Sequence, residues 1–313
     1  MPGPEHLPPI EPMFATVARD TPAAEEEWAA EMKWDGVRAL AYVSDGAVIL
    51  RGRTGRDITA AYPEVAAGLA EVAGPRTLIL DGEITVFDGP HPSFVLLQRR
   101  LHVSRPDPAL VAAVPATYVA FDMLHRAGRP LLGNPYAQRR ALLDDLAPGA
   151  GAVTIPPAFP GESRAIIETT RQLGLEGVVL KRIGSRYYPG RRTPEWLMIR
   201  HLTTANILIG GWLPGTGWRS AFAGSVLAGR PGPTGLEYLG LVGSGFAEAE
   251  LRDLTTRLRE LQQPESPFGA PLPAGVASRA RWTRPVLAAE VSYTELTPSG
   301  RMRHPVWRGL RPV

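Results

Sequence analysis

Residues 31–38 read EMKWDGVR, and this octapeptide specifies the fold and the chemistry of the chain more tightly than any other stretch. Lys33 and Asp35 lie two positions apart, and Gly36 follows directly. If the segment runs into a strand, Lys33, Asp35 and Val37 share one face. An amine beside a carboxylate and a glycine turn suits attack on an electrophile. Taken alone, however, these residues would more often form a surface turn with a salt bridge.

Lysine is nearly absent from the rest of the chain. Of the 34 lysine and arginine residues only Lys33 and Lys181 are lysine, and all the others are arginine. Arginine stays protonated in proteins, whereas lysine can lose its proton and then act as a nucleophile. Both lysines lie in charge-rich segments next to glycine, so we interpret them as retained for their amines rather than for their charge.

The segments around the octapeptide predict an α+β domain over residues 1–201. Residues 37–53 have the pattern of a β-hairpin, with its turn at Asp45-Gly46. The other elements expected here are strands at 77–87, 116–124 and 176–183 and helices at 137–147 and 162–174. Antiparallel strands mixed with helices, without regular βαβ alternation, indicate the α+β class.

Beyond His201 the sequence changes to short strand-like runs separated by glycine and proline. One amphipathic helix is expected at 248–261, and a proline-rich loop follows it at 262–275. Several short strands with a single helix are typical of a small all-β barrel such as an OB-fold. We therefore expect an OB-fold domain over residues 202–313.

Composition narrows the class of protein further. The 313 residues suffice for two domains, and a charged fraction of 21% is ordinary for a globular chain. Cysteine is absent, which excludes disulfides and thiolate metal sites. The N-terminus lacks the basic and apolar regions of a signal peptide, and no apolar run is long enough to span a bilayer. A cytoplasmic protein is expected.

The octapeptide resembles the adenylation motif of the covalent nucleotidyltransferases, which comprise ATP-dependent DNA ligases, RNA ligases and mRNA capping enzymes. Further segments match this superfamily in order and spacing over nearly the whole chain: RGRTGRD (51–57), LDGEI (80–84), VAFDML (119–124), EGVVLKR (176–182) and EWLMIR (195–200). Two more segments, YYPGRR (187–192) and RHPVWRGLR (303–311), resemble the bacterial branch that contains the ligase domains of end-joining ligases.

The resemblance implies an ATP-dependent DNA ligase of the bacterial repair type, in which Lys33 attacks the α-phosphorus and carries AMP. It also implies that the nucleotide is contacted by Glu31, Arg38, Arg53, Glu83, Phe121, Lys181 and Arg200. Phe121 would stack on adenine, although by itself it would be interpreted as a core residue. The attacking amine must be neutral, and nearby positive charge from Arg38, Lys181, Arg200 and a metal would favour loss of its proton.

The resemblance further implies a metal and a DNA substrate. Glu83 and Glu176 would offer oxygens to Mg²⁺ or Mn²⁺, which neutralises phosphate charge. The DNA contacts implied are Arg53, Arg186, Arg191 and Arg192, since arginines near exposed backbone suit phosphate binding. The expected partners are nicked duplex DNA and, in end joining, Ku or a repair polymerase/primase. A monomer at the nucleoid is expected.

One segment departs from the pattern. The last of the nucleotide motifs usually reads W-x-K-x-K, whereas this chain has Trp196, Met198 and Arg200. Arg200 keeps its charge, but Met198 removes a cation from the phosphate site, which would slow the reaction roughly a hundredfold. Three rival interpretations stay open: an RNA ligase or capping-type enzyme, a nick-binding relative weakened by Met198, and a structural scaffold, which leaves the lysine pattern unexplained.

Overall fold

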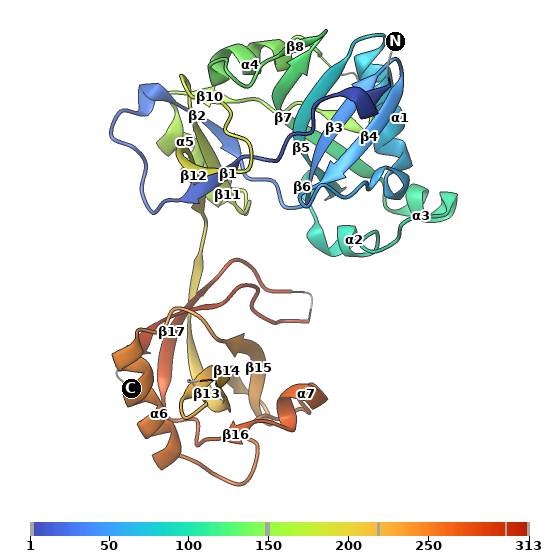
Figure 1. The fold of residues 1–313 in the computed structure, drawn as a ribbon. Helices are drawn as coiled ribbons and strands as arrows, with labels where there is room; N and C mark the ends of the chain where they lie inside the picture. The colour runs from blue at the N-terminus through green and yellow to red at the C-terminus, as the bar shows by residue number, and fades with distance from the viewer. Residues whose placement is uncertain (1–2, 148–150, 218–219, 298, 312–313) are drawn as a thin grey trace. The chain divides into compact units, whose positions relative to one another are not determined.

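The structure is a computed structural model that describes residues 3–147, 151–217, 220–297 and 299–311. The chain divides into two compact units, Met1–His201 and Leu202–Val313, coloured blue to yellow and yellow to red in Figure 1. Strands and helices alternate irregularly in the first unit, and strands dominate the second. The expected α+β class is therefore confirmed.

Two β-sheets build the first unit. The larger follows the order β4 (Ala47–Gly52), β3 (Val37–Ser44), β5 (Leu78–Asp88), β7 (Ala116–Arg126) and β8 (Arg129–Pro130), with β6 (His91–Pro92) beside β5 and β9 (Val153–Thr154) beside β7. The smaller follows the order β1 (Phe14–Val17), β12 (Arg192–Arg200), β11 (Gly177–Arg182), β2 (Trp28–Met32) and β10 (Phe159–Pro160). Only the β1–β12 and β7–β9 pairs are parallel among the strands described.

The hairpin expected at 37–53 is confirmed as β3 and β4. Its turn residues, Asp45 and Gly46, have φ values of 47° and 78°. Two successive residues with positive φ are what a tight two-residue hairpin turn requires, and Asp-Gly tolerates this conformation best. The strands expected at 77–87, 116–124 and 176–183 are confirmed as β5, β7 and β11.

The helices of the first unit cover the outer faces of the sheets. They are α1 (Pro63–Ala73), α2 (Phe94–Gln98), α3 (Pro108–Ala113), α4 (Tyr136–Asp144) and α5 (Ser163–Gln172), with short 3₁₀ turns η1 (Pro4–His6), η2 (Glu25–Glu27) and η3 (Thr59–Ala61). The helices expected at 137–147 and 162–174 are confirmed as α4 and α5, although α4 ends three residues early. Proline at position 148 disfavours helix in the residue before it, which accounts for the shorter element.

Hydrophobic clusters pack the helices onto the sheets and the two sheets against each other. On the larger sheet, α1 packs Val65 and Leu69 against Leu50 and Leu80, which are all buried. On the smaller sheet, α5 packs its apolar face against β11 and β12, through Ile166, Ile167, Val178, Leu180 and Ile199. Between the sheets a third cluster joins Leu40, Tyr42 and Ile79 to Phe121 and Trp196. The inner faces of the two sheets therefore meet where the candidate residues lie.

The second unit is a small antiparallel β domain. Its strands follow the order β15 (Gly235–Val242), β14 (Ala223–Gly232), β13 (Thr203–Pro214), β17 (Ala288–Tyr293) and β18 (Val306–Arg311), with β16 (Arg281–Trp282) beside β13. The helix expected at 248–261 is confirmed as α6 (Glu248–Glu260), which packs Leu251, Leu254 and Leu258 into the core. The first turn of α6 carries acidic residues and the last turn carries basic residues. These charges interact favourably with the helix dipole and stabilise the helix.

The proline-rich segment after α6 is a loop, as expected, until the short helix α7 (Ala274–Ala277). The loop packs the buried ring of Phe268 against β13 and β14. This close approach requires glycine at position 210, because a Cβ there would lie 2.5 Å from the Phe268 ring. Among the described residues, no helix combines the length and apolar character that crossing a membrane demands.

Candidate functional site

A cavity of about 240 Å³ opens between the two sheets of the first unit. Its size is near the lower end of the range for small-molecule sites. Strand alternation explains one wall, because Glu31 pairs with Val179 and Val179 pairs with Met198 across neighbouring strands. Residues two positions along point to the same face. That wall accordingly carries Glu31, Val179, Lys181, Trp196, Met198 and Arg200.

The opposite wall comes from the larger sheet. Arg38 on β3 and Glu83 on β5 are directly paired, so both side chains reach the cavity from one face. Phe121 reaches the cavity through an irregularity in the strand pairing. The pairing of β5 with β7 shifts between Asp81 and Gly82, which leaves Phe121 as the extra residue of a β-bulge. Bulges re-aim side chains, and this one turns Phe121 toward the cavity.

Lys33 lies in the turn that connects these walls. β2 ends at Met32 and β3 begins at Val37, so Lys33 and Asp35 are not in a strand, and the shared strand face is not formed. The Lys33 backbone N–H donates to Gly177 O at 2.9 Å. Gly36 allows the turn, because a Cβ there would lie 2.2 Å from Ile84 O.

The Lys33 amine lines the cavity and forms an ion pair with the Glu176 carboxylate. Both side chains are only 17% exposed. Glu176 lies just before β11 at the side of the cavity. Attack by the amine requires that this ion pair be broken. The sequence did not predict this contact.

Arg38 is fixed by Asp81, a residue that the sequence analysis passed over. Its guanidinium donates to both Asp81 oxygens at 2.6 Å and lies 4.5 Å from the centroid of the Phe121 ring. Burial lowers the pKa of the Arg38 guanidinium, but Asp81, Tyr187 and Glu83 together raise it by more, so the pKa lies above its ordinary value and Arg38 stays charged. The Tyr187 hydroxyl donates to Asp81 at 2.7 Å and completes the arrangement.

Lys181 lies at the closed end of the cavity, only 1% exposed. Its amine is 2.9 Å from Glu31 Oε2 and donates to Phe121 O at 2.8 Å. The centroids of the Phe121 and Trp196 rings are 4.6 and 4.5 Å away. Burial lowers the pKa of Lys181, and the Glu31 carboxylate opposes the shift. The second lysine of the chain is thus a buried cation inside an aromatic cage.

Phe121 is not open for stacking in this state. It is 7% exposed, and both the Arg38 guanidinium and the Lys181 amine lie close to its ring. A planar base that stacked on Phe121 would require one of these cations to move. The sequence placed Phe121 near the nucleotide, and the structure adds that its ring is covered by charge.

Burial raises the pKa of Glu83 to about 7 from its ordinary 4.5, while Arg38 and Lys33 oppose the shift. The unfolded chain loses this proton near pH 4.5 and the folded protein near pH 7. The contribution of Glu83 to folding stability therefore falls as pH rises between those values and is constant above pH 7.

We expect Glu83→Gln, measured in EDTA, to gain stability relative to the wild type between pH 5 and pH 8, on the order of 1 kcal/mol. Urea unfolding at both pH values measures the effect. The same substitution at the exposed Glu265 is the matched control. A stability difference that does not change with pH would contradict the prediction.

The carboxylates fit a divalent metal of the magnesium type. Glu83 and Glu176 are both close enough to Lys33 to interact with its charge. No group of three or more His, Cys, Asp or Glu side chains suited to a metal ion exists within the described ranges. Magnesium commonly takes one or two carboxylates and completes its shell with water and phosphate oxygens. Glu83 on the cavity lining and Glu176, which pairs with Lys33, could supply the two carboxylates.

The four arginines expected at DNA are not brought together. Arg53 and Arg192 line the cavity, with their guanidinium carbons 4.9 and 5.8 Å from the Phe14 ring centroid. Arg186 and Arg191 are exposed, and Arg186 lines a different cavity. The lining residues that the sequence did not single out are Phe14, Ala15, Met32, Trp34 and Val179. Phe14 belongs to none of the motifs, and only its position on β1 places it at the cavity.

Met198 lines the cavity, at the position that is lysine in the W-x-K-x-K pattern of the family that the sequence resembles. We expect Met198→Lys to seal a nicked duplex at least as fast as the wild type, and up to about a hundredfold faster, because it restores a cation to the phosphate site. The rate is measured with a labelled nicked duplex under single-turnover conditions. Leu173→Lys, on an exposed side chain of the same unit, controls for added charge. A slower Met198→Lys enzyme would show that the methionine is adapted to its place.

Comparisons with known proteins agree with this geometry. Residues 12–200 match the family described as "ATP dependent DNA ligase domain", and residues 219–313 match "ATP dependent DNA ligase C terminal region". The multifunctional non-homologous end joining DNA repair protein LigD of Mycobacterium tuberculosis is 44% identical over 304 residues, which cover 97% of this chain but 38% of that protein. The chain therefore spans well under half the length of this relative.

Two further likenesses complete the comparison. DNA ligase C of Mycobacterium tuberculosis is 31% identical over 265 residues, covering 82% of this chain and 72% of that protein. A solved structure described as mycobacterial DNA ligase D complexed with ATP and MES is 42% identical, covers 97% of this chain and 95% of that one, and superposes with a TM-score of 0.58. These matches bear out the expected fold, an α+β unit followed by an OB-like β domain.

Proposed function

The chain belongs to the ATP-dependent DNA ligase family, and from this we propose that it seals nicks in duplex DNA through AMP carried on Lys33. Residues 1–201 act as the adenylation domain and residues 202–313 as the OB-fold domain. The observation that carries the proposal is the Lys33 amine at a cavity lined by five further cations: Arg38, Arg53, Lys181, Arg192 and Arg200. An amine nucleophile in a cationic cavity suits attack on a phosphate.

In the first step the Lys33 nitrogen forms a bond to the α-phosphorus of ATP, and the bond from that phosphorus to pyrophosphate breaks. Before the amine attacks, the ammonium loses a proton to water and its contact with Glu176 breaks. Arg38 and Arg200 stabilise the negative charge that develops on the phosphate oxygens. A divalent metal ion, Mg²⁺ or Mn²⁺, held by Glu83 and Glu176, would supply further charge neutralisation.

In the second and third steps the AMP moves from Lys33 to the 5′-phosphate of a nick, and the 3′-hydroxyl then displaces it. The new phosphodiester replaces the phosphoanhydride, and AMP leaves. Arg53 and Arg192 lie on the cavity lining, and Arg186 and Arg191 are exposed, so these four contact the DNA phosphates.

Glu31 and Lys181 recognise the base. Adenine offers an amino group, which donates, beside a ring nitrogen, which accepts. A carboxylate and an ammonium held 2.9 Å apart offer the complementary acceptor and donor. Guanine reverses both groups and would face a carboxylate with its carbonyl oxygen and an ammonium with its N–H. The pair therefore selects ATP over GTP, which separates this chain from the capping enzymes.

The test is incubation with Mg²⁺ and either α-labelled or γ-labelled ATP, followed by denaturing electrophoresis. We expect label on the protein only from the α-labelled nucleotide, and sealing of a nicked duplex but not of one with a one-nucleotide gap. Binding to the nicked duplex without any protein label would instead identify a nick-binding relative that has lost the chemistry. Labelling by GTP would favour a capping-type enzyme.

We further propose that the protein acts as a monomer in repair by end joining, in the cytoplasm at the nucleoid, with Ku or a repair polymerase/primase as partner. The 44% identity to a LigD protein named for non-homologous end joining supports this setting. Joining of linear duplexes with and without added Ku tests it, and a joining yield that Ku leaves unchanged would count against the partnership.

A further inference from the structure

We propose that Tyr136 of α4 is a positioning residue that holds the Glu31 carboxylate in the orientation that recognises adenine, against the pull of Arg140 on the same helix. The inference rests on the proposed function, because it concerns the base end of the same cavity. Neither residue lines that cavity or belongs to a motif that the sequence analysis singled out. They act on the nucleotide through Glu31.

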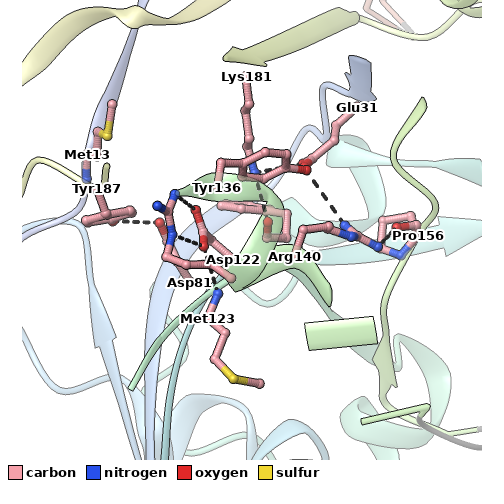
Figure 2. Close-up of polar contacts among 12 residues, drawn as sticks. Met13, Glu31, Asp81, Asp122, Met123, Tyr136, Arg140, Pro156, Lys181 and Tyr187 are labelled. Atoms are coloured by element: carbon pink, nitrogen blue, oxygen red, sulfur yellow. Dashed lines mark hydrogen bonds and ion pairs between the residues drawn. The ribbon is translucent and has the colours of Figure 1, made fainter. Parts of the chain in front are cut away.

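Other side chains contact both carboxylate oxygens of Glu31. The Tyr136 hydroxyl donates to Oε1, the Lys181 amine lies 2.9 Å from Oε2, and Arg140 Nη1 lies 3.9 Å from Oε1. Figure 2 shows these side chains converging from three different elements. All four residues are buried, with exposed fractions between 1% and 7%. A carboxylate buried this far needs such partners, because isolated charge in the interior is costly.

The helix that carries Tyr136 and Arg140 is itself anchored. The two residues are four positions apart and therefore share one helix face. Arg140 Nη2 donates to Pro156 O at 2.5 Å and to Asp144 at 2.6 Å. At the start of the helix, the Tyr136 N–H donates to Ser185 O at 2.8 Å. These contacts tie α4 to the segments that follow β9 and β11, so the side chains that reach Glu31 come from an anchored helix.

The arrangement leaves Glu31 able to accept from a ligand. A carboxylate has about four acceptor positions, and Tyr136 and Lys181 use one on each oxygen. Burial and the Glu31 charge raise the pKa of Tyr136, so its hydroxyl keeps its proton and remains a donor. With one oxygen fixed by each partner, the remaining lone pairs keep a constant direction toward the cavity. That direction decides whether an adenine amino group is well aligned.

Arg140 supplies an opposing force. Its Nη1 is buried and has no hydrogen-bond partner among the described residues, although it faces Glu31. A buried unsatisfied donor gains free energy from any acceptor that moves within reach. Tyr136 keeps Glu31 from turning toward Arg140. Without the Tyr136 hydroxyl, the carboxylate would rotate to Arg140 and away from the base.

The experiment compares Tyr136→Phe with the wild type in formation of lysyl-AMP, using ATP and GTP separately. We expect KM for ATP to rise about tenfold, as for loss of one hydrogen bond to a charged group. The rate at saturating ATP should stay unchanged, because Lys33 is untouched. The preference for ATP over GTP should fall by a similar factor.

Tyr42→Phe is the matched control. Tyr42 is also 1% exposed, and its hydroxyl accepts from Ile10 N at 2.9 Å; it lies on β3 of the larger sheet, whereas Glu31 lies on β2 of the smaller sheet. Both variants lose a buried tyrosine hydroxyl, so both should lose some thermal stability, but only Tyr136→Phe should change KM and base preference. Arg140→Gln gives an independent variant should Tyr136→Phe fold poorly. It removes the opposing charge, so KM for ATP should stay at or below the wild-type value, and a rise in KM would contradict the inference.

A double variant separates positioning from simple destabilisation. In a Glu31→Gln background the Tyr136→Phe change should have little further effect on base preference, because its target is already altered. Equal KM and base preference in Tyr136→Phe and wild type, with normal labelling of both, would overturn this inference alone. Failure of the wild type to take label from α-labelled ATP would instead overturn the proposed function.

Discussion

Replacing Lys33 by arginine or alanine is expected to abolish the covalent AMP adduct completely. Arginine keeps the positive charge and nearly the length of lysine, but its guanidinium does not lose a proton in proteins and so cannot attack phosphorus. Since the side chain is only 17% exposed beside Glu176, Lys33→Arg can preserve the ion pair while removing the nucleophile. Sealing of a nicked duplex from ATP should fall below detection in both variants.

The composition of the chain makes this measurement unusually clean. Lys181 is the only other lysine, and it is 1% exposed and bonded to Glu31. Mass spectrometry of proteolytic peptides should place one AMP on the peptide that contains residue 33 and none on the peptide that contains residue 181. An adduct that persists in Lys33→Arg, at any position, would refute the assigned nucleophile.

Replacing Arg139 by leucine is expected to destabilise the first unit by about 3–5 kcal/mol, the usual cost of leaving one member of a buried ion pair alone. Arg139 donates to both Asp122 oxygens, at 2.8 and 2.9 Å, and both side chains are 0% exposed. It also donates to the carbonyls of Asn134 and Ser185, at 2.7 and 2.9 Å. The substitution therefore leaves the Asp122 carboxylate and two backbone carbonyls without their hydrogen-bond donor.

Arg171→Leu is the matched control for this loss. Arg171 also pairs with a carboxylate, Glu168, but its side chain is 57% exposed and that of Glu168 is 53% exposed. Exposed pairs contribute at most about 1 kcal/mol, so the control should unfold close to the wild type in urea. Similar midpoints for Arg139→Leu and Arg171→Leu would mean that the buried pair is not needed to hold β7 and α4 together.

The elements with strong local patterns were predictable. The Asp-Gly turn, the alternating strands around it and the amphipathic α6 depend on neighbours in the chain, and the structure confirmed them. The short strand β1 and the helix α1 were not expected. Phe14 on β1 has no local signal, because β1 pairs with β12, which lies far along the chain.

The residues of the site also fall into two groups, those that local sequence patterns indicated and those that only the structure revealed. The motifs brought Glu31, Arg38, Glu83 and Lys181 to attention, and all four line the cavity around Lys33. Asp81, Tyr136 and Tyr187 were passed over, although they hold Arg38 and Glu31 in place. Their importance arises from partners more than 40 positions away in sequence. No spacing within one segment could have indicated such contacts.

The sequence by itself determined the kind of chemistry, because a neutral amine can come only from Lys33 or Lys181 in a chain whose other cations are all arginine. It also determined the ordered set of segments that supply carboxylates and cations. The motif pointed to Lys33, and the tertiary structure gave the physical reason why that lysine is available and Lys181 is not. Register between distant strands buries Lys181 against Glu31 and leaves Lys33 in a turn at the cavity, and burial depends on packing that no local pattern encodes.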